Sequence, residues 1–101
     1  MIRHIVMWSV AGQTEQQRIE ARLRVKSAFE GLRGRIPGMR SLDVGIDFSD
    51  VDYACDVVLV AEFESRRSLD DYATHPEHAQ VRAQLNGLRI ARHQVDYVVE
   101  C

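Results

Sequence analysis

The chain has 101 residues, which is enough for one compact domain with one hydrophobic core and too few for two. Hydrophobic residues make up 46% and charged residues 28% of the sequence, as in ordinary folded proteins, so we expect residues 1–101 to form a single domain without a disordered tail. The 13 basic and 15 acidic residues are scattered along the chain and leave a net charge of −2, which favours neither a nucleic-acid partner nor a membrane partner.

The first segment, residues 2–10, has the alternating pattern of a β-strand. It is too short and too polar for a signal peptide or a membrane span, so we expect a cytoplasmic protein. The residues on one face of this strand are Ile2, His4, Val6, Trp8 and Val10. His4 is therefore expected among large apolar neighbours.

A helix and a second strand follow. Thr14 and Gln17 have the spacing of a capping box, and apolar residues then recur at helical intervals up to Leu32. Gly34 predicts the end of this helix, since Pro37 prevents its continuation. Residues 39–47 alternate again and predict the second strand.

The second half of the chain predicts two more strands and two short helical segments. Residues 55–63 are apolar on both faces, as expected of a central strand. Ser65 is a suitable N-cap for a helix through Tyr72, and a second helix starts at Pro76 with Thr74 or His75 as its cap. Residues 91–99 alternate and predict the last strand.

The resulting order, β-α-β-β-α-β, is that of an α+β, ferredoxin-like fold, in which a four-stranded antiparallel sheet carries its helices on one face. The other face would expose apolar side chains, and a large exposed apolar surface usually marks an interface. Those side chains are Ile5, Met7, Val58 and Val60. We therefore expect a homodimer that forms through the open sheet face.

Five short motifs, taken in order, resemble the stress-responsive dimeric α/β-barrel (Dabb) family over essentially the whole chain. They are "IRHIV", "IPGM", "EFES", "DYATHPEH" and "VDYVV". The resemblance implies a ferredoxin-like subunit and a dimer formed sheet to sheet. Many members of the family have no assigned reaction, but a plant branch includes polyketide cyclases that carry out a cofactor-free aldol condensation in the cleft between sheet and helices.

The resemblance to that branch also implies a set of site residues. The positions matching its acting groups are Tyr72, His78 and His4, with His78 as the base and Tyr72 as a hydrogen-bond donor to the enolate oxygen. The expected substrate-binding wall consists of Val6, Trp8, Val25 and Phe29. The expected ligand is a small apolar carbonyl compound, and no cofactor is implied.

Two other interpretations of "YATHPEH" stay open. The segment is also explained as a helix start, with His75 as a cap before Pro76 and His78 exposed in the first turn. A metal site would need His75, His78 and a carboxylate such as Glu77 or Asp71. Because Pro76 places His75 outside the helix and no third ligand has a defined spacing, we predict no metal.

Three functions are compatible with this sequence. The first is a cofactor-independent lyase or cyclase acting on a small carbonyl or polyketide-like substrate. The alternative is a non-catalytic dimeric protein that binds a small ligand or is associated with stress. A cofactor-free oxygenase is a third hypothesis that depends on fold analogy alone. An open cavity that reaches His78 and Tyr72 would favour the first, and a cleft filled by Trp8 and Phe29 the second.

Overall fold

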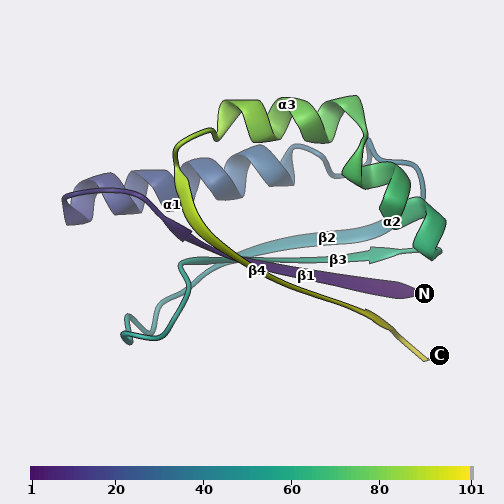
Figure 1. The fold of residues 1–101 in the computed structure, drawn as a ribbon, viewed down its shortest axis with the longest axis horizontal. Helices are drawn as coiled ribbons and strands as arrows, with labels where there is room; N and C mark the ends of the chain where they lie inside the picture. The colour runs from purple at the N-terminus through teal and green to yellow at the C-terminus, as the bar shows by residue number, and fades with distance from the viewer. Residues whose placement is uncertain (101) are drawn as a thin grey trace.

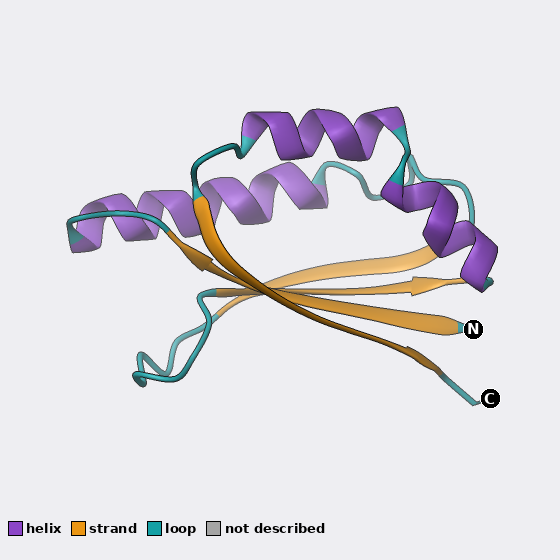
Figure 2. Cartoon of the chain, in the orientation of Figure 1, coloured by secondary structure: helices purple, strands orange, loops and turns teal. Residues whose placement is uncertain are grey.

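A computed structural model describes residues 1–100, and Cys101, the last residue of the predicted domain, lies outside them. The elements in chain order are β1 (Ile2–Val10), α1 (Glu15–Glu30), β2 (Met39–Ile46), β3 (Val57–Phe63), α2 (Arg66–Ala73), α3 (Pro76–Gln84) and β4 (Arg89–Val98). The predicted ferredoxin-like order is confirmed, with the second helical region divided into α2 and α3 (Figures 1 and 2). Within residues 1–100 no helix has the length and apolar character needed to cross a membrane.

The four strands form one antiparallel sheet in the order β2-β3-β1-β4. The first strand of the chain is therefore a central strand, paired with β3 on one side and with β4 on the other. All three helices cover the same face of this sheet, as Figure 2 shows. The other face carries no element among the described residues.

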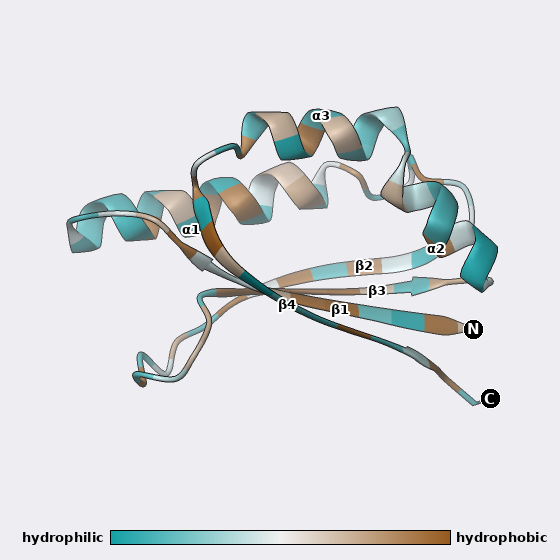
Figure 3. Ribbon diagram, in the orientation of Figure 1, coloured by the Kyte–Doolittle hydropathy of each residue, from teal (hydrophilic) through white to brown (hydrophobic). Residues whose placement is uncertain are grey.

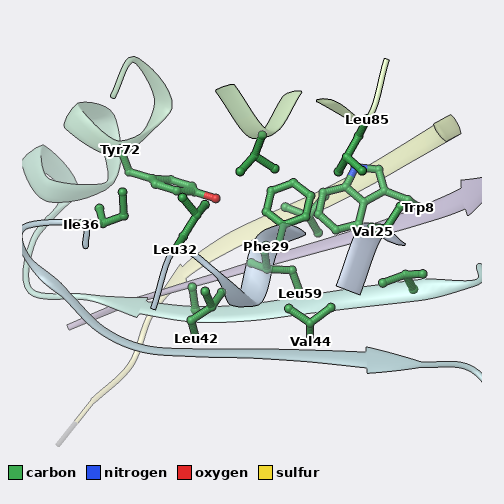
Figure 4. Packing of buried hydrophobic residues seen from close by; sticks show 14 of the residues in the cluster. Trp8, Val25, Phe29, Leu32, Ile36, Leu42, Val44, Leu59, Tyr72 and Leu85 are labelled. Carbon is green, nitrogen blue, oxygen red and sulfur yellow. The ribbon is translucent and has the colours of Figure 1, made fainter. Parts of the chain in front are cut away.

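The core lies between the sheet and the helices because side chains alternate along each strand. On β1 the side chains that point to the helices are buried, whereas Met7, on the other face, is 36% exposed. Figure 4 shows the core residues Val25 and Phe29 of α1 packing over Leu59 of β3 and Val44 of β2. On α3, apolar and polar residues alternate around the helix, with Val81 buried (Figure 3).

The start of α1 has the predicted capping box. The Thr14 hydroxyl accepts a hydrogen bond from the Gln17 backbone N–H at 3.1 Å, and the Gln17 side chain accepts one from the Thr14 N–H at 3.4 Å. The predicted end near Gly34 was wrong, because α1 ends at Glu30. From there the backbone changes to tighter turns, in which the Leu32 N–H donates to the Phe29 carbonyl, and Gly34 takes a positive φ of 80° within them.

Two strand boundaries also differ from the predicted ones. The last strand, β4, begins at Arg89 and not at residue 91, because its pairing with β1 continues past an irregularity near Val10. The third strand, β3, begins at Val57 and not at residue 55. The residue before it, Asp56, turns its carboxylate toward β1 and α1.

That carboxylate connects three parts of the fold. Asp56 accepts hydrogen bonds from the Val10 backbone N–H at 2.8 Å and from Nε and Nη2 of Arg22 at 3.0 and 2.6 Å. Both side chains of the Arg22–Asp56 pair are only 18% exposed. Both Arg22 nitrogens donate to Oδ1, whereas the Val10 N–H donates to Oδ2. Partly buried hydrogen bonds between charged groups are stronger than an exposed ion pair. It joins the end of β1, the middle of α1 and the start of β3.

We expect Asp56→Ala to lower the free energy of unfolding by about 2–3 kcal/mol, because it leaves a partly buried guanidinium and a backbone N–H without their acceptor. Urea unfolding followed by circular dichroism measures the change. Asp52→Ala, in the exposed loop before β3, is the control and should change stability by less than about 0.5 kcal/mol. Equal effects of the two substitutions would contradict the structural importance of Asp56.

Candidate active site

A cavity of about 620 Å³ lies between the sheet and the helices. This volume is within the range typical of small-molecule sites, about 300–1,000 Å³. Its inner wall is formed by His4, Val6 and Trp8 of β1, Phe29 of α1, Tyr72 of α2 and His78 of α3. Of the predicted site residues, only Val25 does not line it, since that side chain is completely buried in the core beneath.

Tyr72 and His78 meet because the chain breaks between α2 and α3. Residues six positions apart on one continuous helix would lie about 120° apart around its axis. Here α2 ends at Ala73, and Pro76 starts α3 in a new direction. The rings of Tyr72 and His78 consequently stack, with their centroids 4.2 Å apart and an interplanar angle of 30°.

His75, just after this break, is the N-cap of α3. Its ring Nδ1 accepts a hydrogen bond from the Glu77 backbone N–H at 3.1 Å, so the prediction of a capping His75 is confirmed. Because Nδ1 accepts this hydrogen bond, the neutral ring carries its own hydrogen on Nε2. Residues 1–100 contain no group of three or more His, Cys, Asp and Glu side chains placed to hold a metal ion.

The surroundings of Tyr72 keep its hydroxyl protonated. The residue is 3% exposed and packs against Phe63, with ring centroids 5.2 Å apart. Burial raises the pKa of the Tyr72 phenol to about 12, because the charged phenolate is disfavoured away from water. Figure 4 shows the hydroxyl directed away from α2, toward Phe29. At neutral pH this group can donate a hydrogen bond.

His78 is held in a form that can accept a proton. Its Nδ1 lies 3.4 Å from the Ala73 carbonyl oxygen, which can only accept, so Nδ1 carries the hydrogen and Nε2 has the free lone pair. Burial lowers the pKa of His78 below the ordinary 6.5, and the positive charge of Arg82 lowers it further, although the hydrogen bond to Ala73 acts in the opposite direction. The ring is therefore neutral at pH 7.

His4 completes the group from the sheet side. It is buried, and its ring lies edge-on to Tyr72 with the centroids 6.1 Å apart. Its Nδ1 is 2.5 Å from Oδ1 of Asp96, the residue directly opposite it on β4. Gln94 donates to the other oxygen of Asp96 at 2.8 Å. This carboxylate orients the His4 ring, as second partners of functional histidines commonly do.

The rest of the wall is aromatic. Trp8 and Phe29 stack with centroids 4.7 Å apart and an angle of 18° (Figure 4). Both residues line the cavity and do not fill it. The guanidinium of Arg89, at the start of β4, lies over both rings, 5.4 Å from the Trp8 centroid and 5.7 Å from the Phe29 centroid. Such an arrangement is favourable as a cation–π contact.

The sequence did not identify the contribution of β4. Its alternation places Gln94 and Asp96 on one face, but that pattern does not tell which face meets the helices. The register with β1 shows that these residues, together with Arg92, face the cavity side. A base, a neutral donor and an apolar wall thus converge, as needed to remove a proton next to a carbonyl group.

Solved structures share this fold. A dimeric ferredoxin-like protein of unknown function from Bacteroides fragilis is 27% identical with a TM-score of 0.83, over 95% of this chain and 93% of that one. A hydroxynitrile lyase from Passiflora edulis is 16% identical with a TM-score of 0.77, over 98% and 93%. A Dabb family protein from Mesorhizobium loti is 19% identical with a TM-score of 0.68, over 99% and 97%.

A search of curated protein sequences found no match. A family model, described as the stress responsive A/B barrel domain (Dabb), matches residues 2–99, nearly the whole chain. The resemblance based on the five sequence motifs is thereby confirmed. This chain belongs to the stress responsive A/B barrel domain family.

Proposed function

We propose that this protein is a cofactor-independent lyase or cyclase that acts on a small carbonyl compound. The observation that carries the proposal is the stacked Tyr72–His78 pair at the wall of an open cavity. A buried, protonated phenol beside a neutral imidazole provides a donor and a base in one place. The proposal includes no metal or organic cofactor.

The proposed reaction is an intramolecular aldol condensation. Nε2 of His78 removes a proton next to a ketone, and the Tyr72 hydroxyl donates a hydrogen bond to the enolate oxygen that forms. The enolate carbon then bonds to a second carbonyl carbon of the same molecule, and the proton on His78 passes to the new alkoxide. His78 next removes a second proton next to the ketone, and the hydroxyl group leaves with that proton as water, which forms the C=C bond of the enone. His4, oriented by Asp96, lies across the Tyr72 ring and restricts the position of the substrate.

Two observations support this function. The cavity is not filled by Trp8 and Phe29, which stack along its wall. The Passiflora edulis protein of the same fold is a lyase, so the fold is compatible with such chemistry. A ligand-binding protein would require an open cavity too, but not a base beside a donor.

We also propose that the chain forms a homodimer through the open sheet face. No element among the described residues covers the apolar side chains on that face, and Val95 of β4 is 57% exposed. Val95 lies opposite Ile5, which in turn lies opposite Val60, so an apolar row crosses three strands. Burial of such a surface usually requires a partner. The dimeric state of the Bacteroides fragilis protein supports the same assembly here.

The first prediction concerns His78 and Tyr72. Heptane-2,6-dione closes by an aldol reaction to 3-methylcyclohex-2-enone and water, and the enone is followed by its ultraviolet absorbance. We expect His78→Ala to lower kcat/KM by about 10² to 10⁴, the usual loss of a general base. Tyr72→Phe should lower kcat with little change in KM, because only the hydroxyl is removed.

The matched control for this experiment is His75→Ala. His75 caps α3 but does not line the cavity, so its loss should cost about 1 kcal/mol of stability and leave kcat/KM within about twofold. Full activity of His78→Ala, in a protein that demonstrably converts the dione, would contradict the proposed base.

A second prediction concerns pH. His78 must be neutral to accept a proton, and its pKa is lowered, so kcat/KM should fall on acidification with a midpoint below 6.5. The donor Tyr72 keeps its proton well above the ordinary pKa of 10.0, so the rate should persist through pH 10. A pH–rate profile with the dione measures both limbs. A midpoint above 6.5 on the acidic limb of the profile would contradict the assignment of His78 as the base.

The third prediction concerns the dimer. Light scattering at micromolar concentration should give twice the mass of the chain. Val58→Lys places a charge at the centre of the open sheet face and should produce a folded monomer, because burial of an unpaired ammonium is costly. Gln80→Lys on the exposed side of α3 should stay dimeric. A monomeric native protein would contradict the proposed assembly.

A further inference from the structure

Three arginines converge on the outer part of the same cavity. Arg82 extends from α3, and Arg89 and Arg92 extend from β4, so the three reach the cavity from both of its sides. Within residues 1–100 none of them forms an ion pair or a side-chain hydrogen bond, whereas Arg3, Arg22 and Arg35 each have a carboxylate partner. The reaction proposed for His78 and Tyr72 makes no use of these charges.

The positive charges of these three arginines repel one another. Arg89 is half-buried over the stacked Trp8 and Phe29 rings. Burial lowers the pKa of Arg89, and the like charges of Arg92 and Arg82 lower it further. Asp96, the carboxylate on the same face of β4, is already engaged by His4 and Gln94. Within residues 1–100, therefore, no carboxylate side chain balances the three positive charges.

We infer that the cavity takes substrates with an apolar body and a terminal carboxylate, which is bound by Arg89 and Arg92 with Arg82 nearby. This inference rests on the proposed function for the reacting end of the molecule, which would lie at Tyr72 and His78. The binding of the carboxylate end requires no reaction.

The apolar wall of the cavity suits the apolar body of such a ligand, and the arginines suit its carboxylate. Leu69 and Ile90 line the cavity without being fully buried and offer apolar surface for the body, above buried Trp8 and Phe29. The Arg89 guanidinium carbon lies 5.4 Å and 5.7 Å from the two ring centroids. Because no side-chain hydrogen bond or ion pair within residues 1–100 engages its N–H donors, they are available to an acid. Planar guanidinium groups bind carboxylates with two parallel hydrogen bonds, which favours this anion over a neutral amide of the same shape.

The test is a binding titration with 4-phenylbutanoate and its neutral counterpart 4-phenylbutanamide. The only tryptophan of the chain is Trp8 in the cavity wall, so its fluorescence reports occupancy directly. We expect the acid to bind at least about tenfold more tightly than the amide, since hydrogen bonds to charged groups are the stronger ones. A higher salt concentration should weaken binding of the acid and leave binding of the amide unchanged.

Variants then assign the difference to particular residues. Arg89→Gln and Arg92→Gln should each weaken binding of the acid about fivefold or more. Binding of the amide should change by less than about twofold, which also shows that the variants are folded. The control is Arg24→Gln, an exposed arginine of α1 that does not line the cavity, and it should leave both affinities unchanged.

Equal affinities for the acid and the amide would overturn the inference. So would an Arg24→Gln variant that loses as much affinity for the acid as Arg89→Gln and Arg92→Gln do. If 4-phenylbutyl phosphate bound more than tenfold more tightly than the acid, the site would be one for a phosphate and not for a carboxylate. That result would also overturn the inference. Because binding is measured without turnover, the result is separate from the proposed reaction. His78→Ala should abolish cyclisation of the neutral dione and still bind 4-phenylbutanoate.

Discussion

The candidate site depends on the register between β1 and β4. In that register His4 lies opposite Asp96, Val6 opposite Gln94 and Trp8 opposite Arg92. A slip of one residue would turn the cavity-facing side chains of β4 to the other side of the sheet. The base and donor come from helices, but the partner of His4 and two of the three arginines come from this one strand pairing.

Burial has opposite effects on the two groups of the proposed pair, and both effects are useful. It raises the pKa of the Tyr72 phenol and lowers that of the His78 imidazole, because in each case the charged form loses hydration. Both groups are consequently neutral over a wide pH range. The outer cavity differs, since it gathers positive charge at Arg89 and its neighbours. A substrate would thus meet an apolar reacting end and a charged entrance.

Local signals in the sequence predicted most of the fold. The capping box at Thr14 and the proline after His75 each act through the backbone of a few neighbouring residues, so their structural effects are visible in the sequence. The end of α1 was placed too late, because Gly34 ends a series of turns and not the helix itself. Asp96 was missed, since strand alternation defines two faces without saying which one is covered.

The pairing of β1 with β4 also has a consequence for how the site forms. His4 and Asp96 are separated by 92 positions in the sequence, and both ends of the chain lie at the same end of the sheet (Figure 1). Closing so long a loop has an entropic cost that must be met before its contacts form, which slows folding. As an edge strand with exposed residues on both faces, β4 can also open locally while β2, β3 and the helices stay folded. A ligand bound between β4 and the helices would oppose such opening.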